Sequence, residues 1–146
     1  MALSAPGRYL RQIAGLFTER LTPDRLLALL KHPLTASGGD RGLHLKLTRD
    51  LELKLRRYGP AFPTDLDITA WADTQRTEGA AQWADSLSPI FTALRGGETT
   101  PLADHVARHR DLAERLAGAD SGGLWHKDAG LKALALMQDL ATEAPF

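Results

Sequence analysis

The chain has 146 residues, of which 43% are hydrophobic and 25% charged, and its formal net charge is zero. That length suits a single domain over residues 1–146 that buries roughly two-thirds of its unfolded surface. Nothing approaches the roughly 18 consecutive apolar residues of a transmembrane helix, and the first residues lack the apolar core of a signal peptide. The absence of cysteine excludes disulfides and cysteine-ligated metal centres from this chain. We therefore expect a cytoplasmic protein with no membrane partner.

The zero net charge hides an uneven distribution along the chain. Residues 1–60 contain eleven Lys and Arg against five Asp and Glu, whereas residues 61–146 contain seven against thirteen. The first part therefore carries an excess of six positive charges and the second part an excess of six negative charges. Such a division is typical of a protein that meets nucleic acid on one side only. Attraction between the two halves, or simple solvation of helix faces, explains it as well.

Capping residues mark the starts of the first two predicted helices. Ser4 opens a helix over about residues 6–20, where apolar residues recur at helical spacing. Thr22 caps a second helix, which Pro33 ends because the residue before a proline is displaced from the helical region. We expect these two helices to build core through the following side chains: Tyr9, Leu10, Ile13, Ala14, Phe17, Leu26, Leu27, Leu29 and Leu30.

Residues 40–59 are ambiguous, because leucines alternate with polar residues as in a half-buried strand. The length of the run, its many helix formers and its scarcity of β-branched residues favour a helix that Asp40 caps. One face of that helix should be buried, through Leu43, Leu47, Leu51, Leu55 and Tyr58. Leu45 and Leu53 lie on the other side, among basic residues. Because a helix that is apolar on two sides is usually covered on both, we expect the chain to lack a neighbour.

Further helices are predicted over about residues 67–75, 79–94, 101–117 and 128–143. Pro89 predicts a kink near Leu87, Gly96 and Gly97 end that helix, and Thr100 caps the next one. The expected inward side chains are Ile68, Trp71, Ala80, Trp83, Ala84, Leu87, Phe91, Leu94, Leu102, Val106, Leu112, Leu116, Leu131, Leu134, Ala135, Leu136 and Leu140, with Trp125 against the start of the last helix. The predicted fold class is all-α, a compact bundle of about six or seven helices.

Most catalytic signatures are absent from the sequence. It contains no glycine-rich phosphate-binding motif and no Gly-x-Ser-x-Gly elbow. His105 and His109 have the spacing of two metal ligands on a helix, but Val106 stands where a metalloprotease has its glutamate. Arg108 and Arg110 would also repel a cation. A structural role for the histidines is favoured over a metal-dependent hydrolase.

Two other polar clusters resemble sites but are explained more simply by helix starts. The segment 125–128 combines a tryptophan, a histidine and both charges, as expected where a helix begins with an aromatic plug and a first-turn acid. Asp65, Asp67 and Asp73 could form a carboxylate site, although capping and first-turn placement account for the first two. We therefore predict no catalytic, cofactor or metal site.

The basic residues of the third predicted helix are the better functional candidates. Phosphate contacts need no sequence motif, only accessible Lys and Arg. The candidate DNA-phosphate contacts are Arg41, Lys46, Arg49, Lys54, Arg56 and Arg57. An exposed helix face with i,i+4 pairs such as Asp50–Lys54 is the alternative.

Several segments, taken in order, carry a family resemblance. Residues 26–34, Leu-Leu-Ala-Leu-Leu-Lys-His-Pro-Leu, resemble an element in the helical accessory subdomain of UvrD/RecB-type helicases. The landmarks that accompany it lie at residues 6–10, 41–44, 56–60, 101–106, 124–125 and 133–137. Their order resembles the AddB subunit family of bacterial AddAB-type double-strand-break repair helicase–nucleases, in its alphaproteobacterial form.

The resemblance implies that this chain is an internal piece of a longer subunit, so that its bundle is incomplete. The family pairs with an AddA-type helicase–nuclease subunit, acts on DNA and uses ATP, magnesium and an iron–sulfur cluster elsewhere in the protein. The function implied for this chain is that of a non-catalytic accessory region, not an enzyme by itself, that positions or contacts DNA and packs against the rest of the parent chain. The alternative is a free-standing helical protein–protein interaction module that docks through Leu45 and Leu53.

Overall fold

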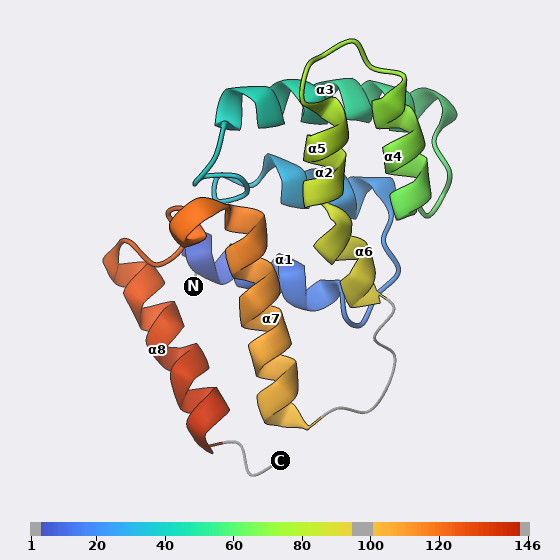
Figure 1. The fold of residues 1–146 in the computed structure, drawn as a ribbon. Helices are drawn as coiled ribbons and strands as arrows, with labels where there is room; N and C mark the ends of the chain where they lie inside the picture. Colours follow the sequence, from blue (N-terminus) through green and yellow to red (C-terminus); the bar gives the residue numbers. More distant parts are fainter. Residues whose placement is uncertain (1–3, 95–100, 144–146) are drawn as a thin grey trace.

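In the computed structural model, the described residues, 4–94 and 101–143, form helices and connecting segments and contain no strand (Figure 1). The elements in order are α1 (Ala5–Gly15), α2 (Pro23–Lys31), α3 (Arg41–Tyr58), α4 (Asp65–Asp73), α5 (Ala80–Ser86), α6 (Ser88–Leu94), α7 (Leu102–Ala117), the short 3₁₀ helix η1 (Ala119–Ser121) and α8 (Asp128–Glu143). Only Leu87 separates α5 from α6, so these two are one predicted helix broken at the kink that Pro89 imposes. The all-α prediction is confirmed.

The predicted caps hold the helix starts in place. The side-chain oxygens of Ser4, Thr22 and Asp40 accept from the backbone N–H three residues on, over 3.1, 3.3 and 3.0 Å. Thr64 and Asp67 form a reciprocal capping box at α4. Each cap pairs a backbone donor that the first helical turn leaves unsatisfied. Asp67 is therefore a capping residue and not part of a paired-carboxylate site.

Helix α2 lies at the centre of the core, between α1 and α3 (Figure 1). Leu26, Leu29 and Leu30 are almost completely inaccessible to solvent, together with Tyr9 of α1 and Leu51 of α3. On the other side α1 is covered by α7 and α8. The leucine-filled segment that ends at Pro33 is thus the central helix of the bundle.

A buried histidine joins three helices, and sequence reasoning missed it. His44 of α3 has Nε2 2.6 Å from the carbonyl oxygen of Leu30, and the indole N–H of Trp83 donates to Nδ1 over 3.0 Å. Since Nδ1 accepts, Nε2 carries the hydrogen and the ring is neutral. Burial holds the pKa of His44 below its ordinary value of 6.5. The ring ties α2, α3 and α5 together.

Two chain segments cross with backbone almost touching backbone. The N–H of Ala36 donates to Leu116 O and that of Gly38 to Ala117 O, each over 2.8 Å. A Cβ on Gly38 would lie 2.3 Å from the carbonyl oxygen of Ala119. Glycine is therefore required where the loop after α2 meets the end of α7.

Several expected positions differ from the structure. Helix α1 ends at Gly15 and not near residue 20, because the chain turns there and carries the buried Leu16 into the core. Tyr58 is 77% exposed, since its side chain projects away from the core at the C-terminal end of α3. Leu102, Ala135 and three leucines of α8 are also exposed, namely Leu131, Leu136 and Leu140.

The exposed leucines of α8 have a simple cause. Among the described elements, helix α8 packs mainly against α7 and α1. Met137 and Gly130 are its buried residues, and Gly130 lies against the backbone of Leu124 and Trp125. Its other sides meet solvent.

Some predictions fall outside the described residues, namely the cap Thr100, the helix end at Gly96 and Gly97, and the inward side chain of Leu94. No described helix has the length and apolar character needed to cross a membrane.

Candidate nucleic-acid interface

Helix α3 has one buried side and one basic side. Leu47, Thr48, Leu51 and Leu55 face the core, whereas Lys46, Arg49, Arg56 and Arg57 are exposed. Arg49 and Arg56 are seven residues apart, which places them within about 20° of each other around the helix axis. We name the exposed set Lys46, Arg49, Arg56 and Arg57 the α3 basic face. It extends about 16 Å along the axis at ~1.5 Å per residue.

Two of the six predicted phosphate contacts are not counted in the α3 basic face. Arg41 is half-buried and its Nη1 donates to the carbonyl oxygens of His32 and Thr35, so its guanidinium holds the loop after α2. Lys54 is exposed, and its Nζ lies 5.3 Å from the ring centroid of Tyr58. The Asp50–Lys54 ion pair of the alternative interpretation does not form between these described residues.

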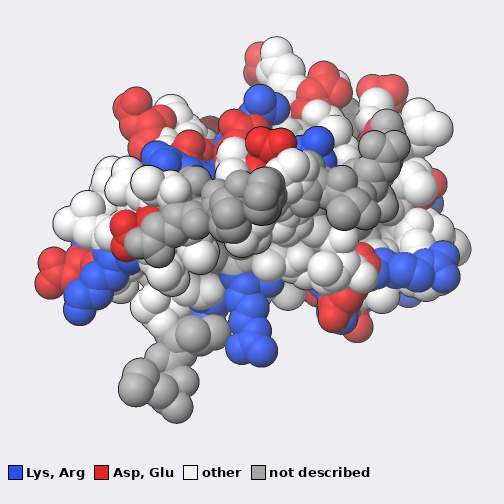
Figure 2. Space-filling view, turned by 90° about the horizontal axis from the view of Figure 1, so that it is seen from below, with Lys and Arg blue, Asp and Glu red and all other residues white. Residues whose placement is uncertain are grey.

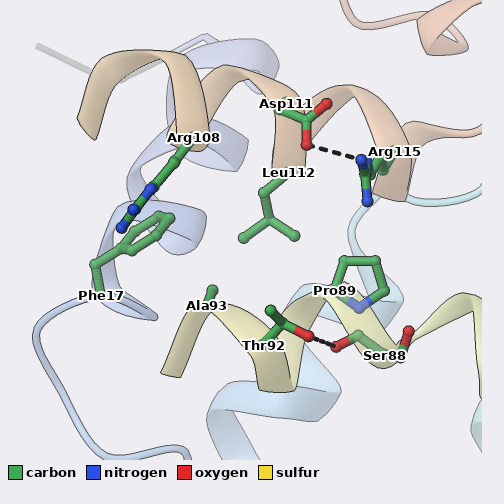
Figure 3. Close-up of a pocket in the computed structure, with 9 residues that line it drawn as sticks. All are labelled: Phe17, Ser88, Pro89, Thr92, Ala93, Arg108, Asp111, Leu112 and Arg115. Atoms are coloured by element: carbon green, nitrogen blue, oxygen red, sulfur yellow. Dashed lines mark hydrogen bonds and ion pairs between the residues drawn. The ribbon is translucent and has the colours of Figure 1, made fainter. Parts of the chain in front are cut away.

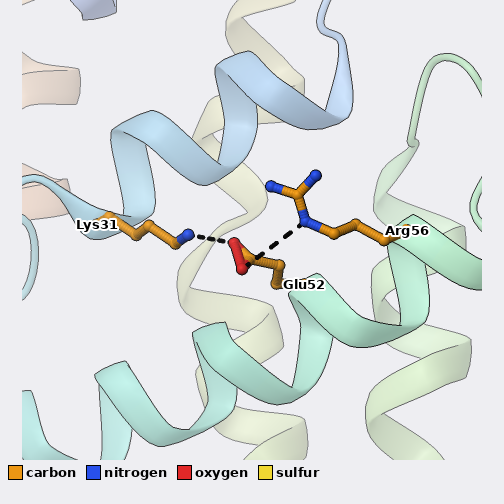
Figure 4. A network of polar contacts seen from close by, with 3 residues as sticks. All are labelled: Lys31, Glu52 and Arg56. Atoms are coloured by element: carbon orange, nitrogen blue, oxygen red, sulfur yellow. Dashed lines mark hydrogen bonds and ion pairs between the residues drawn. The ribbon is translucent and has the colours of Figure 1, made fainter.

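An acidic residue at the edge of the α3 basic face restrains one of its cations. Glu52 accepts from the ammonium of Lys31 on α2, and Arg56 Nε lies 3.8 Å from the other Glu52 carboxylate oxygen (Figure 4). The hydrogen bond from Lys31 lowers the pKa of Glu52, so the carboxylate stays charged. Sequence reasoning missed Lys31 because it belongs to another helix.

The remaining cations of the face have few or no protein partners. Lys46 donates to the hydroxyl of Thr77 over 2.7 Å. Arg49 and Arg57 form no hydrogen bond or ion pair within the described part of the chain. Exposed guanidinium groups without partners can bind phosphate without first breaking an internal contact. Arg49 and Arg57 are therefore the strongest phosphate-binding candidates.

On the side of the molecule away from α3, the described residues carry both signs of charge. Figure 2 shows basic and acidic residues interspersed around that face, with uncharged residues between them. Mixed charges of this kind give no net attraction for a polyanion.

Two exposed leucines of α3, Leu45 and Leu53, lie beside the α3 basic face, on the side of the helix away from the core, as predicted.

The other candidates from the sequence have structural roles. His109 has Nε2 2.7 Å from the carbonyl oxygen of Leu10, which joins α7 to α1. Among residues 4–94 and 101–143, no three His, Asp or Glu side chains are grouped to hold a metal ion. Trp125 donates its indole N–H to Glu114 over 3.1 Å and packs on the core, as expected for a plug at the start of α8.

Comparison of this chain with protein-family models, with curated proteins and with solved structures finds no match. The resemblance to the AddB family therefore stays a prediction from the sequence.

Proposed function

We propose that this chain is a non-catalytic helical region that binds DNA phosphates through the α3 basic face. The observation that carries the proposal is the pair Arg49 and Arg57, which are exposed and have no partner among the described residues, beside Lys46 and Arg56 on the same side of one helix. The family resemblance supports the further proposal that the chain belongs to a DNA double-strand-break repair helicase–nuclease subunit of the AddB type. Its implied partners are DNA, an AddA-type subunit and the rest of the parent chain.

Counterion release gives the expected salt dependence of DNA binding. Each phosphate that a cation neutralises contributes about −0.9 to the slope of log K against log salt on duplex DNA. Four contacts from the α3 basic face predict a slope of about −3.6. The contacts are to the phosphate backbone, so affinity should not depend on base sequence.

Charge reversal within the face is the test. The double variant R49E/R56E should lose most of its low-salt affinity for a labelled duplex, and its salt slope should fall by about 2. The matched control is K127E/K132E, which changes the net charge equally at exposed positions in and just before α8. Binding that is absent at low salt, or lost equally in both double variants, would refute the proposal.

The exposed leucines on the same face support a second candidate, a protein–protein interaction module. Leu53 is 55% exposed and Leu45 is 39% exposed, and such residues anchor partner helices when they are covered. The variant L45S/L53S should then leave duplex binding unchanged, and weaker capture of a purified AddA-type subunit by this variant would favour the repair subunit over a free-standing module. The genomic reading frame adds an independent distinction. A frame that continues into a nucleotide-binding or nuclease motif supports the repair subunit, whereas a frame confined to this chain supports the module.

A further inference from the structure

A cavity of about 500 Å³ lies between α6 and α7, away from the α3 basic face. That volume is within the range of about 300–1,000 Å³ that small-molecule sites occupy. Its middle is apolar, because Leu112 points inward from α7 opposite Ala93 of α6 (Figure 3). Phe17 closes one end, and the ring of His105 contacts it edge-on with 5.0 Å between centroids. The apolar part of the cavity is therefore built by three separate segments.

Charge is distributed unequally between the two ends of this cavity. At the far end from Phe17, Arg115 is 3.0 Å from Asp111, so the two charges neutralise each other. Arg108 lies at the Phe17 end (Figure 3) and has no hydrogen-bond or ion-pair partner among the described residues. Among the described lining residues, one positive charge is therefore uncompensated, and it lies beside the aromatic end.

We propose that this cavity binds a small organic monoanion, with an aromatic or branched apolar body and one acidic group. The body lies between Leu112 and Ala93, where contact with apolar side chains removes it from water. The acid binds the Arg108 guanidinium, whose planar N–H groups match a carboxylate or sulfonate. Among the described lining residues a cation finds no free carboxylate, because Asp111 is already paired with Arg115. For the same reason, a second acidic group on the ligand would find Arg115 already paired.

The test is a fluorescence titration of the full chain with 8-anilino-1-naphthalenesulfonate, an aromatic monoanion of the proposed class. We expect saturable binding with one site per chain. The uncharged N-phenyl-1-naphthylamine should bind at least about tenfold more weakly, because it lacks the group that pairs with Arg108. 1-Naphthoate should compete with the sulfonate for the site.

Three variants test the residues. R108A should lower the affinity about tenfold or more, R108K should keep part of it, and the control R76A, which removes an equal charge at another exposed position, should leave it unchanged. T92W fills the cavity from its exposed rim without removing a charge, and it should abolish binding while the far-UV circular dichroism stays native. Absence of saturable binding, or binding that R108A and T92W both leave intact, would overturn the proposal.

Discussion

The most informative perturbation of the fold is the replacement of His44 by leucine, which removes the hydrogen bonds that join three helices. The His44 ring donates to Leu30 O, a carbonyl in the last turn of α2, where no helical N–H is left to pair with it. It also accepts from the indole of Trp83. H44L leaves one buried donor and one buried acceptor unpaired.

The structure gives a magnitude for H44L. An unpaired buried polar group costs about 1–3 kcal/mol, so two of them predict a loss of about 4 kcal/mol in the free energy of unfolding. For a domain of this size that loss lowers Tm by roughly 10–15 °C. Urea unfolding followed by far-UV circular dichroism measures it, with H126L as the control because His126 is exposed. H126L should change the free energy of unfolding by less than about 0.5 kcal/mol.

A double-mutant cycle separates the hydrogen bond from simple packing. W83F removes the indole donor and leaves the acceptor His44 Nδ1 unpaired, whereas H44L/W83F removes this donor and this acceptor together. The double variant should therefore lose at least about 1 kcal/mol less than the sum of the two single losses. Strict additivity, or an H44L protein as stable as the parent, would refute the assignment of His44 as the residue that joins these helices.

Three further predictions concern charge and backbone. Burial lowers the pKa of three histidines, His32, His44 and His109. Below about pH 6.5 the unfolded chain therefore takes up protons that the folded chain does not. The free energy of unfolding should fall there by up to about 1.4 kcal/mol per pH unit per histidine. Urea unfolding at pH 7.5, 6.5 and 5.5 checks this, and a flat profile would contradict it. E52Q should raise duplex affinity at low salt, because it releases Arg56 from its ion pair. The free energy of unfolding should change by less than about 1 kcal/mol. An unchanged or lower duplex affinity in an electrophoretic shift assay would count against DNA binding by the α3 basic face. G38A should destabilise the protein by about 2 kcal/mol or more, because its Cβ would meet Ala119 O. The control G39A, whose Cβ has an ordinary neighbour at 3.9 Å, should leave the melting temperature nearly unchanged. Equal melting temperatures for the two variants would refute the close crossing of the two backbone segments.

The candidate interface was only partly visible in the sequence. Helical periodicity placed Arg49, Arg56 and Leu53 on the side of α3 away from the core, because that periodicity belongs to one helix alone. It could not show that Arg41 bonds to loop carbonyls or that Lys31 reaches Glu52. Those partners come from segments whose positions depend on how helices pack, and packing has no local signal in the sequence.

Sequence alone determined the helices of this protein and most of their ends, through caps such as Thr22 and Asp40 and the stop at Pro33. These features are local, since a cap bonds to an N–H three residues away and a proline restricts its own neighbour. Only the tertiary structure decided that His44 and Trp83, 39 residues apart, share a hydrogen bond. It also decided that the outer leucines of α8 meet solvent. Which apolar positions are covered depends on how many neighbours a helix has, and amphipathic periodicity along one chain does not contain that number.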